Sequence, residues 1–388
     1  MRALALVPVA LLVFALSACG DADPDGPDAG TGGSAGAGGA GGGGGLELPE
    51  IEWLACPSGP GACTSVEVPL DWEHPEDGPT LPFFVRRIPA EGGPSKGQLW
   101  LLQGGPGAAG WAMVDLAPAF RALAPGYDIL VPDYRGTGHS AWLGCERITS
   151  APLDPQCLRD LRGQWGDGLR HFSTTAAVHD IRYVAEALRR EGDRILFYGV
   201  SYGTFVLNRL LTLYPDLPDA ALLDSVCPAS GCDVRMDHNA VRVVQHAFSF
   251  CGDDAFCSER LGADPWGRAM ALFDAMEQGH CAEFVGYPRN VELLGELMIY
   301  GGLYAETLPV ALAAVYRAER CSPDDVVALE QLVENLWGIG GFDPFDAPAA
   351  EDSIYLSLHV VYSEFWPEDL TEEQAYAELD ALPFELGT

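Results

Sequence analysis

The sequence predicts an α/β fold, with a mostly parallel sheet that helices cover on both faces. Three observations support this prediction. Short apolar runs alternate with helix-length segments between about residues 53 and 226. One run, 194–198, leads directly into Gly199-Val200-Ser201-Tyr202-Gly203 and then into another helical segment. Beyond about Asp233 the pattern changes to helical segments without convincing buried strands. Alternation at this spacing implies right-handed crossovers between parallel strands.

The predicted sheet elements follow one another along the chain. The run 98–102 stops at Gly104-Gly105-Pro106-Gly107, as expected of a buried strand that ends in a loop. Ser173 and Thr174 are suitable caps for the next helix. We expect strands at 53–69, 81–89, 98–102, 127–132, 194–198 and 220–226, the last four buried, and helices at 111–123, 173–190 and 204–214.

The second half of the chain is expected to be a helical cap. Helical patterns occur at 241–250, 266–278, 291–300, 308–320 and 323–337. In folds of this class such an insertion sits over the carboxyl ends of the strands, where ligands bind. We therefore predict a core at 48–232 and a cap at 233–388.

The N-terminus resembles a bacterial lipoprotein signal. Arg2 precedes an apolar stretch, which ends in Leu16-Ser17-Ala18-Cys19 and is too short to span a membrane. The resemblance implies cleavage before Cys19 and lipid attachment to its thiol, so residues 1–19 are a signal peptide. Residues 20–47 are dominated by small residues that cannot form a core, so they are predicted to be a disordered tether. The expected location is the bacterial cell envelope.

Composition excludes some classes of partner. The chain has 22 Lys and Arg against 56 Asp and Glu, a formal net charge of −34. Binding to nucleic-acid phosphates requires clustered basic residues, so we expect no nucleic-acid partner. The 48% of hydrophobic residues is enough for one large domain, or for a core with an insertion.

The cysteines predict disulfides. Of the 11 cysteines, ten remain once Cys19 is set aside, and eight of these are close neighbours in sequence. We expect five disulfides in an oxidising compartment. A zinc site is the weaker alternative, because neither a C-x-x-C pair nor paired histidines occur beside them. We expect no metal and no cofactor. The pairs are Cys56 with Cys63, Cys145 with Cys157, Cys227 with Cys232, Cys251 with Cys257, and Cys281 with Cys321.

The Gly199–Gly203 pentapeptide has the pattern of a nucleophile elbow. A strand that turns at once into a helix strains the backbone at the serine and requires small residues two positions away on each side. Ser201 is therefore the candidate nucleophile. The backbone N–H groups of Gly105 and Tyr202 are the candidate oxyanion hole, which would stabilise negative charge on a substrate oxygen. The pattern also occurs by chance, and the glycine turn could be a plain loop.

Several motifs together resemble the proline iminopeptidase and tripeptidyl aminopeptidase branch of the α/β-hydrolases. They are Q-G-G-P-G at 103–107, D-Y-R-G-T-G-H-S at 133–140 and G-V-S-Y-G at 199–203, with V-P-L-D-W at 68–72, C-x5-C at 251–257 and L-S-L-H-V-V-Y-S-E at 356–364. The resemblance implies a secreted serine hydrolase that releases residues from peptide N-termini, or a relative that acts on esters or amides.

The resemblance fails at two members of the catalytic triad. In this family an acid and a histidine follow the cap, near G-x-x-D-x-x-T-P and G-H-G segments, and neither segment is present. Asp343 with His359 is a weak substitute, and a cap loop with a partly buried histidine is the alternative. A C-terminal truncation would explain the absence. A non-catalytic surface protein of this fold is the competing interpretation. Gln103, where histidine is common, is a milder departure.

Other candidates have structural alternatives. Asp133 and Arg135 are expected to form a structural ion pair rather than to act in catalysis. Asp224 follows a strand and could orient a histidine, although no histidine is suitably placed. Glu364 stands where the family has a cap acid, and either binds a substrate ammonium or is a solvated acid. Trp337 and Trp366 are expected in the core.

Overall fold

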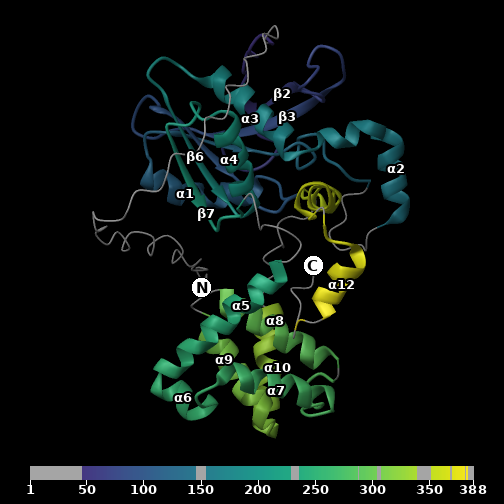
Figure 1. The fold of residues 1–388 in the computed structure, drawn as a ribbon. Helices are drawn as coiled ribbons and strands as arrows, with labels where there is room; N and C mark the ends of the chain where they lie inside the picture. The colour runs from purple at the N-terminus through teal and green to yellow at the C-terminus, as the bar shows by residue number, and fades with distance from the viewer. Residues whose placement is uncertain are drawn as a thin grey trace, which may run out of the picture. The chain divides into compact units, whose positions relative to one another are not determined.

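The structure, a computed structural model, describes residues 46–145, 154–228, 236–286, 288–303, 307–338, 351–367, 369–380 and 382. Residues 54–224 contain a seven-stranded sheet (Figure 1). Its strand order is β1-β2-β3-β5-β4-β6-β7. The strands are β1 (Leu54–Ala55), β2 (Ala62–Pro69), β3 (Thr80–Ile88), β4 (Gly97–Leu102), β5 (Asp128–Pro132), β6 (Arg194–Val200) and β7 (Ala220–Asp224).

Four neighbouring strands run parallel. β4 pairs in parallel with β5 and β6, and β6 pairs in parallel with β7. The strands β1, β2 and β3 join this block through antiparallel pairs. The predicted α/β class, with a mostly parallel sheet, is confirmed. The prediction of a single strand at 53–69 was wrong, because this range forms two strands, β1 and β2. The chain turns between them through Gly59 and Gly61, both at positive φ.

Alternate residues of β4 face opposite sides of the sheet. Trp100 and Leu102 pack in a core with helices α3 (Thr174–Leu188) and α4 (Tyr202–Leu213), which contact each other. Leu99 and Leu101 pack in a second core with α1 (Trp111–Leu123). A strand buried on both faces reads as a continuous apolar run, which is why 98–102 could be recognised from the sequence.

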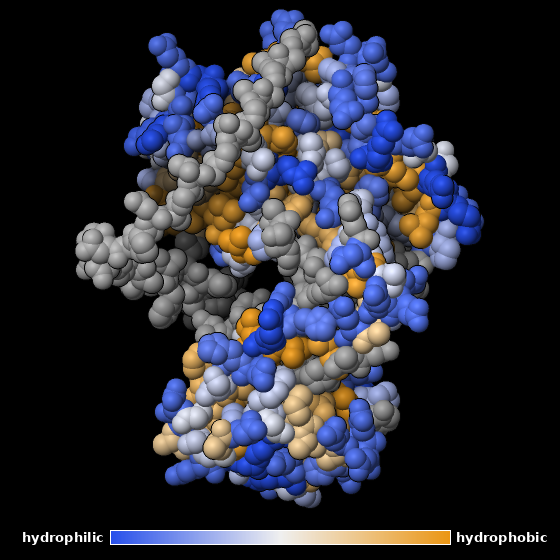
Figure 2. Space-filling view, in the orientation of Figure 1, coloured by the Kyte–Doolittle hydropathy of each residue, from blue (hydrophilic) through white to orange (hydrophobic). Residues whose placement is uncertain are grey.

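β7 forms an exposed edge among the described residues. Four of its five residues are exposed and one is intermediate, and Leu222 is 60% exposed. The strand expected at 220–226 is present as β7, but its predicted burial was wrong. The apolar sequence is typical of a covered strand, but β6 is its only partner in the described sheet. Figure 2 shows an apolar patch at the position of β7.

The elements described beyond residue 236 are all helices, as expected. Several of these helices share an apolar core of their own that includes Phe248, Leu294 and Val315. The helices α6 (Ala255–Leu261) and α12 (Glu372–Asp380) were not foreseen, and neither were α2 (Pro155–Trp165) and η3 (Gly166–His171) in the first half. The bounds are α5 (Met236–Ser249), η4 (Phe250–Asp253), α6 (Ala255–Leu261), α7 (Pro265–Glu277), α8 (Arg289–Leu303), α9 (Leu308–Arg320), α10 (Pro323–Gly338) and α12 (Glu372–Asp380).

One segment of the predicted cap packs on the part of the chain that forms the sheet, residues 46–228, called the sheet domain below. In α11 (Ile354–Val360) and the π-helical turn η5 (Val361–Phe365), the side chains of Leu356, Val360 and Phe365 belong to the same apolar core as Trp100. The sequence offers no buried-strand signal here, so this docking was not foreseen. The predicted boundaries at 48–232 and 233–388 stay predictions.

Four of the five expected disulfides are present. They join Cys56 to Cys63, Cys145 to Cys157, Cys251 to Cys257, and Cys281 to Cys321. Cys227 is also disulfide-bonded, and its expected partner Cys232 lies outside the described residues.

The predicted signal peptide, Cys19 and nearly all of the tether also lie outside the described residues. Within the described part of the chain, no helix combines the length and the apolar character that a membrane span requires.

Candidate active site

Ser201 stands at the junction of β6 and α4 in a strained conformation. Its φ of 54° and ψ of −123° lie outside the usual regions for a residue with a side chain, and its side chain is exposed. The flanking glycines are needed for space. A Cβ on Gly199 would lie 2.5 Å from the Gly203 carbonyl oxygen, and one on Gly203 would lie 2.2 Å from that of Leu102. The geometry is that of the predicted nucleophile elbow.

The glycine turn after β4 lies directly against Ser201. A Cβ on Gly104 would be 2.9 Å from the Ser201 Cβ and 3.3 Å from its Oγ. Gly105 has a φ of 111°, which favours glycine, and a Cβ there would meet the Gly107 and Ala108 nitrogens at 2.8 Å. The turn is therefore close enough to the serine to stabilise charge on a substrate bound there.

Tyr202 is the first residue of α4, so its N–H has no acceptor within the helix. The partial positive charge of the helix N-terminus favours an anion at the same place. The side chain of Tyr202 serves the core instead. It is buried, its hydroxyl is 2.8 Å from the Thr174 Oγ1, and burial raises its pKa. The assignment of Gly105 and Tyr202 as oxyanion donors stays a prediction.

Gln103 holds the start of the glycine turn. Its Oε1 accepts the N–H of Gly104 at 2.9 Å, and its carbonyl oxygen accepts the buried Tyr134 hydroxyl at 3.0 Å. In the sequence, Gln103 stands out only as a departure from histidine, and no motif assigns a role to Tyr134. The spacing of the motifs could not predict this contact, because Gln103 and Tyr134 lie in loops that follow two different strands.

Ser201 has no histidine base in this chain. All eight histidines lie in the described residues, and the contacts of each ring are with partners other than Ser201. The rings of His74 and His171 lie near Asp71, His139 near Glu351, His179 near Tyr214, His238 near Glu378, His246 against Phe250, His280 near the Ala318 carbonyl oxygen, and His359 near the Leu169 backbone.

The pairing of Asp343 with His359 as acid and base stays a prediction. His359 lies in α11, where burial lowers its pKa, which is the partly buried histidine of the alternative interpretation. Asp343 lies outside the described residues. Trp366 is partly buried and stacks on Tyr362, and the side chain of Trp337 is outside the described part.

Asp224, the last residue of β7, accepts two hydrogen bonds from residues at the end of the neighbouring strand β6. Its Oδ2 accepts the Tyr198 hydroxyl at 2.8 Å, and its carbonyl oxygen accepts the N–H of Ser201 at 3.0 Å. Asp224 thus fixes the backbone of the elbow. Burial raises the pKa of Tyr198, so that hydroxyl stays a donor to the carboxylate.

The expected ion pair between Arg135 and Asp133 was wrong in its partner. Arg135 pairs with Asp180 of α3, whereas Asp133 accepts the N–H groups of Gly110 and His139, each at 2.9 Å. Two loop amides satisfy Asp133, so it needs no cation. The expectation that both residues are structural agrees with these contacts.

Glu364 is neither solvated nor free. Its side chain is 14% exposed, and its Oε1 accepts the N–H of Thr174, the first residue of α3, at 2.8 Å. Its Oε2 lies 3.9 Å from the Arg209 Nη2. The N–H of the α3 N-terminus and the nearby Arg209 cation supply partners for this carboxylate. Neither prediction for Glu364, a solvated acid or a free site for a substrate ammonium, fits these contacts.

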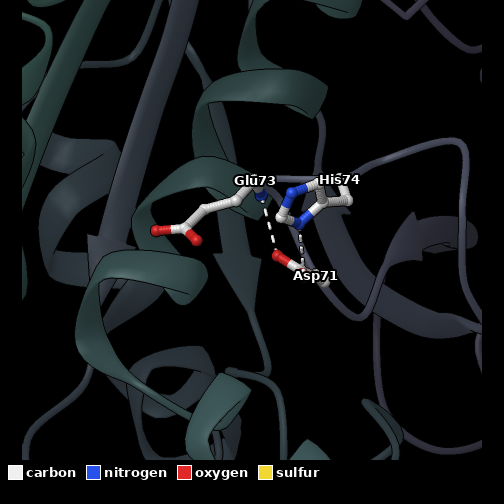
Figure 3. A group of neighbouring side chains, drawn as sticks. All are labelled: Asp71, Glu73 and His74. Atoms are coloured by element: carbon white, nitrogen blue, oxygen red, sulfur yellow. Dashed lines mark hydrogen bonds and ion pairs between the residues drawn. The ribbon is translucent and has the colours of Figure 1, made fainter.

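One cluster of described residues could approach a metal ion. Asp71, Glu73 and His74 lie together after β2 (Figure 3). The His74 Nδ1 lies 3.0 Å from Asp71, and this hydrogen bond raises the pKa of His74 and lowers that of Asp71. The hydrogen bond between His74 and Asp71 accounts for their proximity without a metal ion.

The chain is similar to two named peptidases over part of its length. No family model matches it. It is 30% identical over 208 residues to a tripeptidyl aminopeptidase of Streptomyces lividans, covering 45% of this chain and 38% of that protein. It is 33% identical over 172 residues to a proline iminopeptidase of Aeromonas sobria, covering 42% and 36%. The chain thus spans less than two-fifths of the length of these curated relatives.

Solved structures are also similar over part of the chain. A proline iminopeptidase of Mycobacterium smegmatis is 20% identical, with a TM-score of 0.30 and coverage of 54% of this chain and 59% of that one. An epoxide hydrolase of Vigna radiata is 18% identical, with a TM-score of 0.28 and coverage of 59% and 54%. The sheet, the helices on both of its faces and the elbow at Ser201 are those of an α/β-hydrolase fold.

Proposed function

We propose that the chain is a serine hydrolase of the aminopeptidase type, with Ser201 as the residue that is acylated. The observation that carries the proposal is the strained Ser201, exposed at the end of β6 and packed against the Gly104 turn. The similarity to a tripeptidyl aminopeptidase and a proline iminopeptidase supports peptide N-termini as the substrate class.

The reaction follows from this geometry. The Ser201 Oγ attacks the substrate carbonyl carbon, and the carbonyl π electrons move onto its oxygen, where the N–H groups of Gly105 and Tyr202 are proposed to stabilise the charge. The C–N bond then breaks, the amine leaves with a proton, and an ester to Ser201 remains. Water hydrolyses this ester and restores the hydroxyl.

The missing step is removal of the hydroxyl proton. Each of the eight histidine rings of this chain contacts a partner other than Ser201, so we assign the base to none of them. Loss of a triad base leaves only the modest acceleration that the oxyanion hole and substrate binding provide. This observation favours the second candidate, a non-catalytic surface protein that uses the α/β-hydrolase fold for binding.

Chemical rescue separates the two candidates. We expect a fluorophosphonate to label Ser201 slowly in buffer and at least about 10-fold faster with free imidazole as a diffusible base. The Ser201→Ala variant should not label at this site in either condition, and Ser258→Ala, at a half-buried serine of α6, should behave as wild type. Folded protein that imidazole does not activate would support the non-catalytic candidate.

The substrate class needs its own comparison. With imidazole present, we expect turnover of aminoacyl or tripeptidyl anilides to exceed that of short acyl esters, after correction for the intrinsic reactivity of each. The reverse order would make the protein an esterase or lipase, the second enzymatic alternative.

The same proposal includes a lipid anchor at Cys19 in the bacterial envelope. Its support is the sequence of residues 1–19, with the apolar run that ends in Leu16-Ser17-Ala18-Cys19. We expect the full chain, expressed in a bacterium, to partition into the detergent phase, and Cys19→Ser to remain in the aqueous phase. Equal partitioning of the two would contradict the anchor.

A further inference from the structure

The segment Glu351–Ser357 lies directly on the glycine turn. The N–H of Ser353 donates to the carbonyl oxygen of Gly107 at 2.8 Å. The approach is close, because a Cβ on Gly107 would lie 2.4 Å from the Ser353 carbonyl oxygen and 3.0 Å from the Ser357 Cβ. The turn that carries Gly105 therefore has a second support, far away in sequence.

Asp352 binds the C-terminal end of this turn. Its Oδ1 accepts the N–H of Ala109 at 2.8 Å. The next amide, that of Gly110, donates to the Asp133 Oδ1 at 2.9 Å. Two carboxylates from different parts of the chain thus hold two successive amides. The Asp352 carboxyl is partly buried, and this burial raises its pKa.

Asp352 is itself fixed in place by the core. Its carbonyl oxygen accepts the indole N–H of Trp142 at 2.9 Å, and the N–H of Gly138 donates to the Glu351 carbonyl oxygen at 2.8 Å. The Ser353 Oγ donates to the Leu143 carbonyl oxygen and accepts the N–H of Leu356. A carboxylate on so constrained a backbone can impose its position on the turn.

We propose that Asp352 is a positioning residue for the oxyanion turn. Asp352 holds the Ala109 end, and the contact of Gly104 with Ser201 sets the other end, so the intervening N–H of Gly105 has a defined direction. Electrostatic stabilisation of an oxyanion depends on donors held at hydrogen-bond distance before the charge forms. A misplacement of about 1 Å can cost about 100-fold in rate. This inference rests on the proposed function of Ser201.

The test compares two substitutions at Asp352. Asp352→Ala removes the acceptor for the Ala109 N–H, whereas Asp352→Asn keeps an oxygen that can accept it. Asp264→Ala is the matched control, because it removes a carboxylate bond of the same length, 2.8 Å to the Gly267 N–H, at the start of α7. Thermal unfolding of each variant identifies those that remain folded.

Labelling kinetics with a fluorophosphonate and imidazole give the first readout. We expect Asp352→Ala to lower the maximal labelling rate at least about 10-fold, with less than a 2-fold change in the concentration for half-maximal rate. Asp352→Asn should recover to within about 3-fold of wild type, and Asp264→Ala should match it. Wild-type kinetics in folded Asp352→Ala would overturn the proposal, as would failure of Asp352→Asn to recover.

Amide hydrogen exchange separates this inference from the proposed function. If wild-type protein does not label at all, the function of Ser201 fails, and exchange at residues 107–110 still tests the role of Asp352. We expect at least about 10-fold faster exchange of these amides in Asp352→Ala, with recovery in Asp352→Asn. Unchanged exchange would mean that Asp352 does not hold the turn.

Discussion

Arg135 and Asp180 form a two-point ion pair inside the sheet domain. The Arg135 Nε lies 2.8 Å from the Asp180 Oδ2, and its Nη2 lies 2.6 Å from Oδ1. The other guanidinium hydrogens donate to the carbonyl oxygens of Pro69, Leu70 and His171. One buried guanidinium therefore joins the end of β2 to the last residue of η3 and to α3.

Removing the charge of Asp180 should lower the free energy of unfolding. Asp180→Asn leaves the 2%-exposed guanidinium without its counter-charge, which costs about 3–5 kcal/mol when a buried pair is broken on one side. Denaturant unfolding monitored by tryptophan fluorescence measures the loss. The same substitution at the exposed Asp160 of α2 should change stability by less than about 0.5 kcal/mol. Equal stability of Asp180→Asn and wild type would show that the guanidinium is compensated in another way.

Gly203 should tolerate no side chain. A Cβ there would lie 2.2 Å from the Leu102 carbonyl oxygen, so β4 and α4 would have to move apart. We expect Gly203→Ala to destabilise the fold by about 1–3 kcal/mol and to slow the labelling of Ser201. A Cβ on Gly163, inside α2, would meet no atom within 4 Å, so Gly163→Ala should be neutral or stabilise by up to about 1 kcal/mol. Thermal melts of the pair check this difference, and a melt of Gly203→Ala at the wild-type temperature would contradict it.

The sequence predicted those parts of the fold that depend on local pattern. The buried run 98–102, the helix at 111–123 and the elbow at Ser201 are all marked by apolar periodicity or by glycines with a steric role. Cysteine spacing predicted the pairs, because short loops leave few alternatives.

Contacts between distant segments could not be predicted in this way. The partner of Arg135 is 45 residues away on a helix face, and the sequence neighbour Asp133 was the wrong choice. Glu364 caps a helix that begins 190 residues earlier, and Asp352 reaches Ala109 across 243 residues. Periodicity tells which face of an element is buried, but it does not tell which polar group on another element will lie opposite.

The exposed edge of β7 should promote association at high concentration. Leu222 is 60% exposed on a strand whose second edge has no partner among the described strands. Open apolar edges are templates for pairing with another chain. We expect Leu222→Lys to reduce concentration-dependent light scattering while the melting temperature stays within about 2 °C. Leu158→Lys, at a 48%-exposed leucine of α2, should leave scattering unchanged. An equal effect of both substitutions would point to net charge rather than to the edge.

His179 should make the fold sensitive to mild acid. Burial lowers the pKa of His179 to about 4, and the positive charges of Arg135 and Arg182 contribute to this shift. The unfolded chain binds a proton below the ordinary pKa of 6.5, whereas the folded chain does not until about 4. Stability from this group is therefore complete above pH 6.5 and is lost as the pH falls toward 4. Because the ring is partly exposed, we expect the loss to be about 1 kcal/mol.

Unfolding free energies of wild type and His179→Gln, measured from about pH 7 to 4.5, should converge as the pH falls. Parallel curves would show that His179 binds its proton equally well in the folded and the unfolded protein.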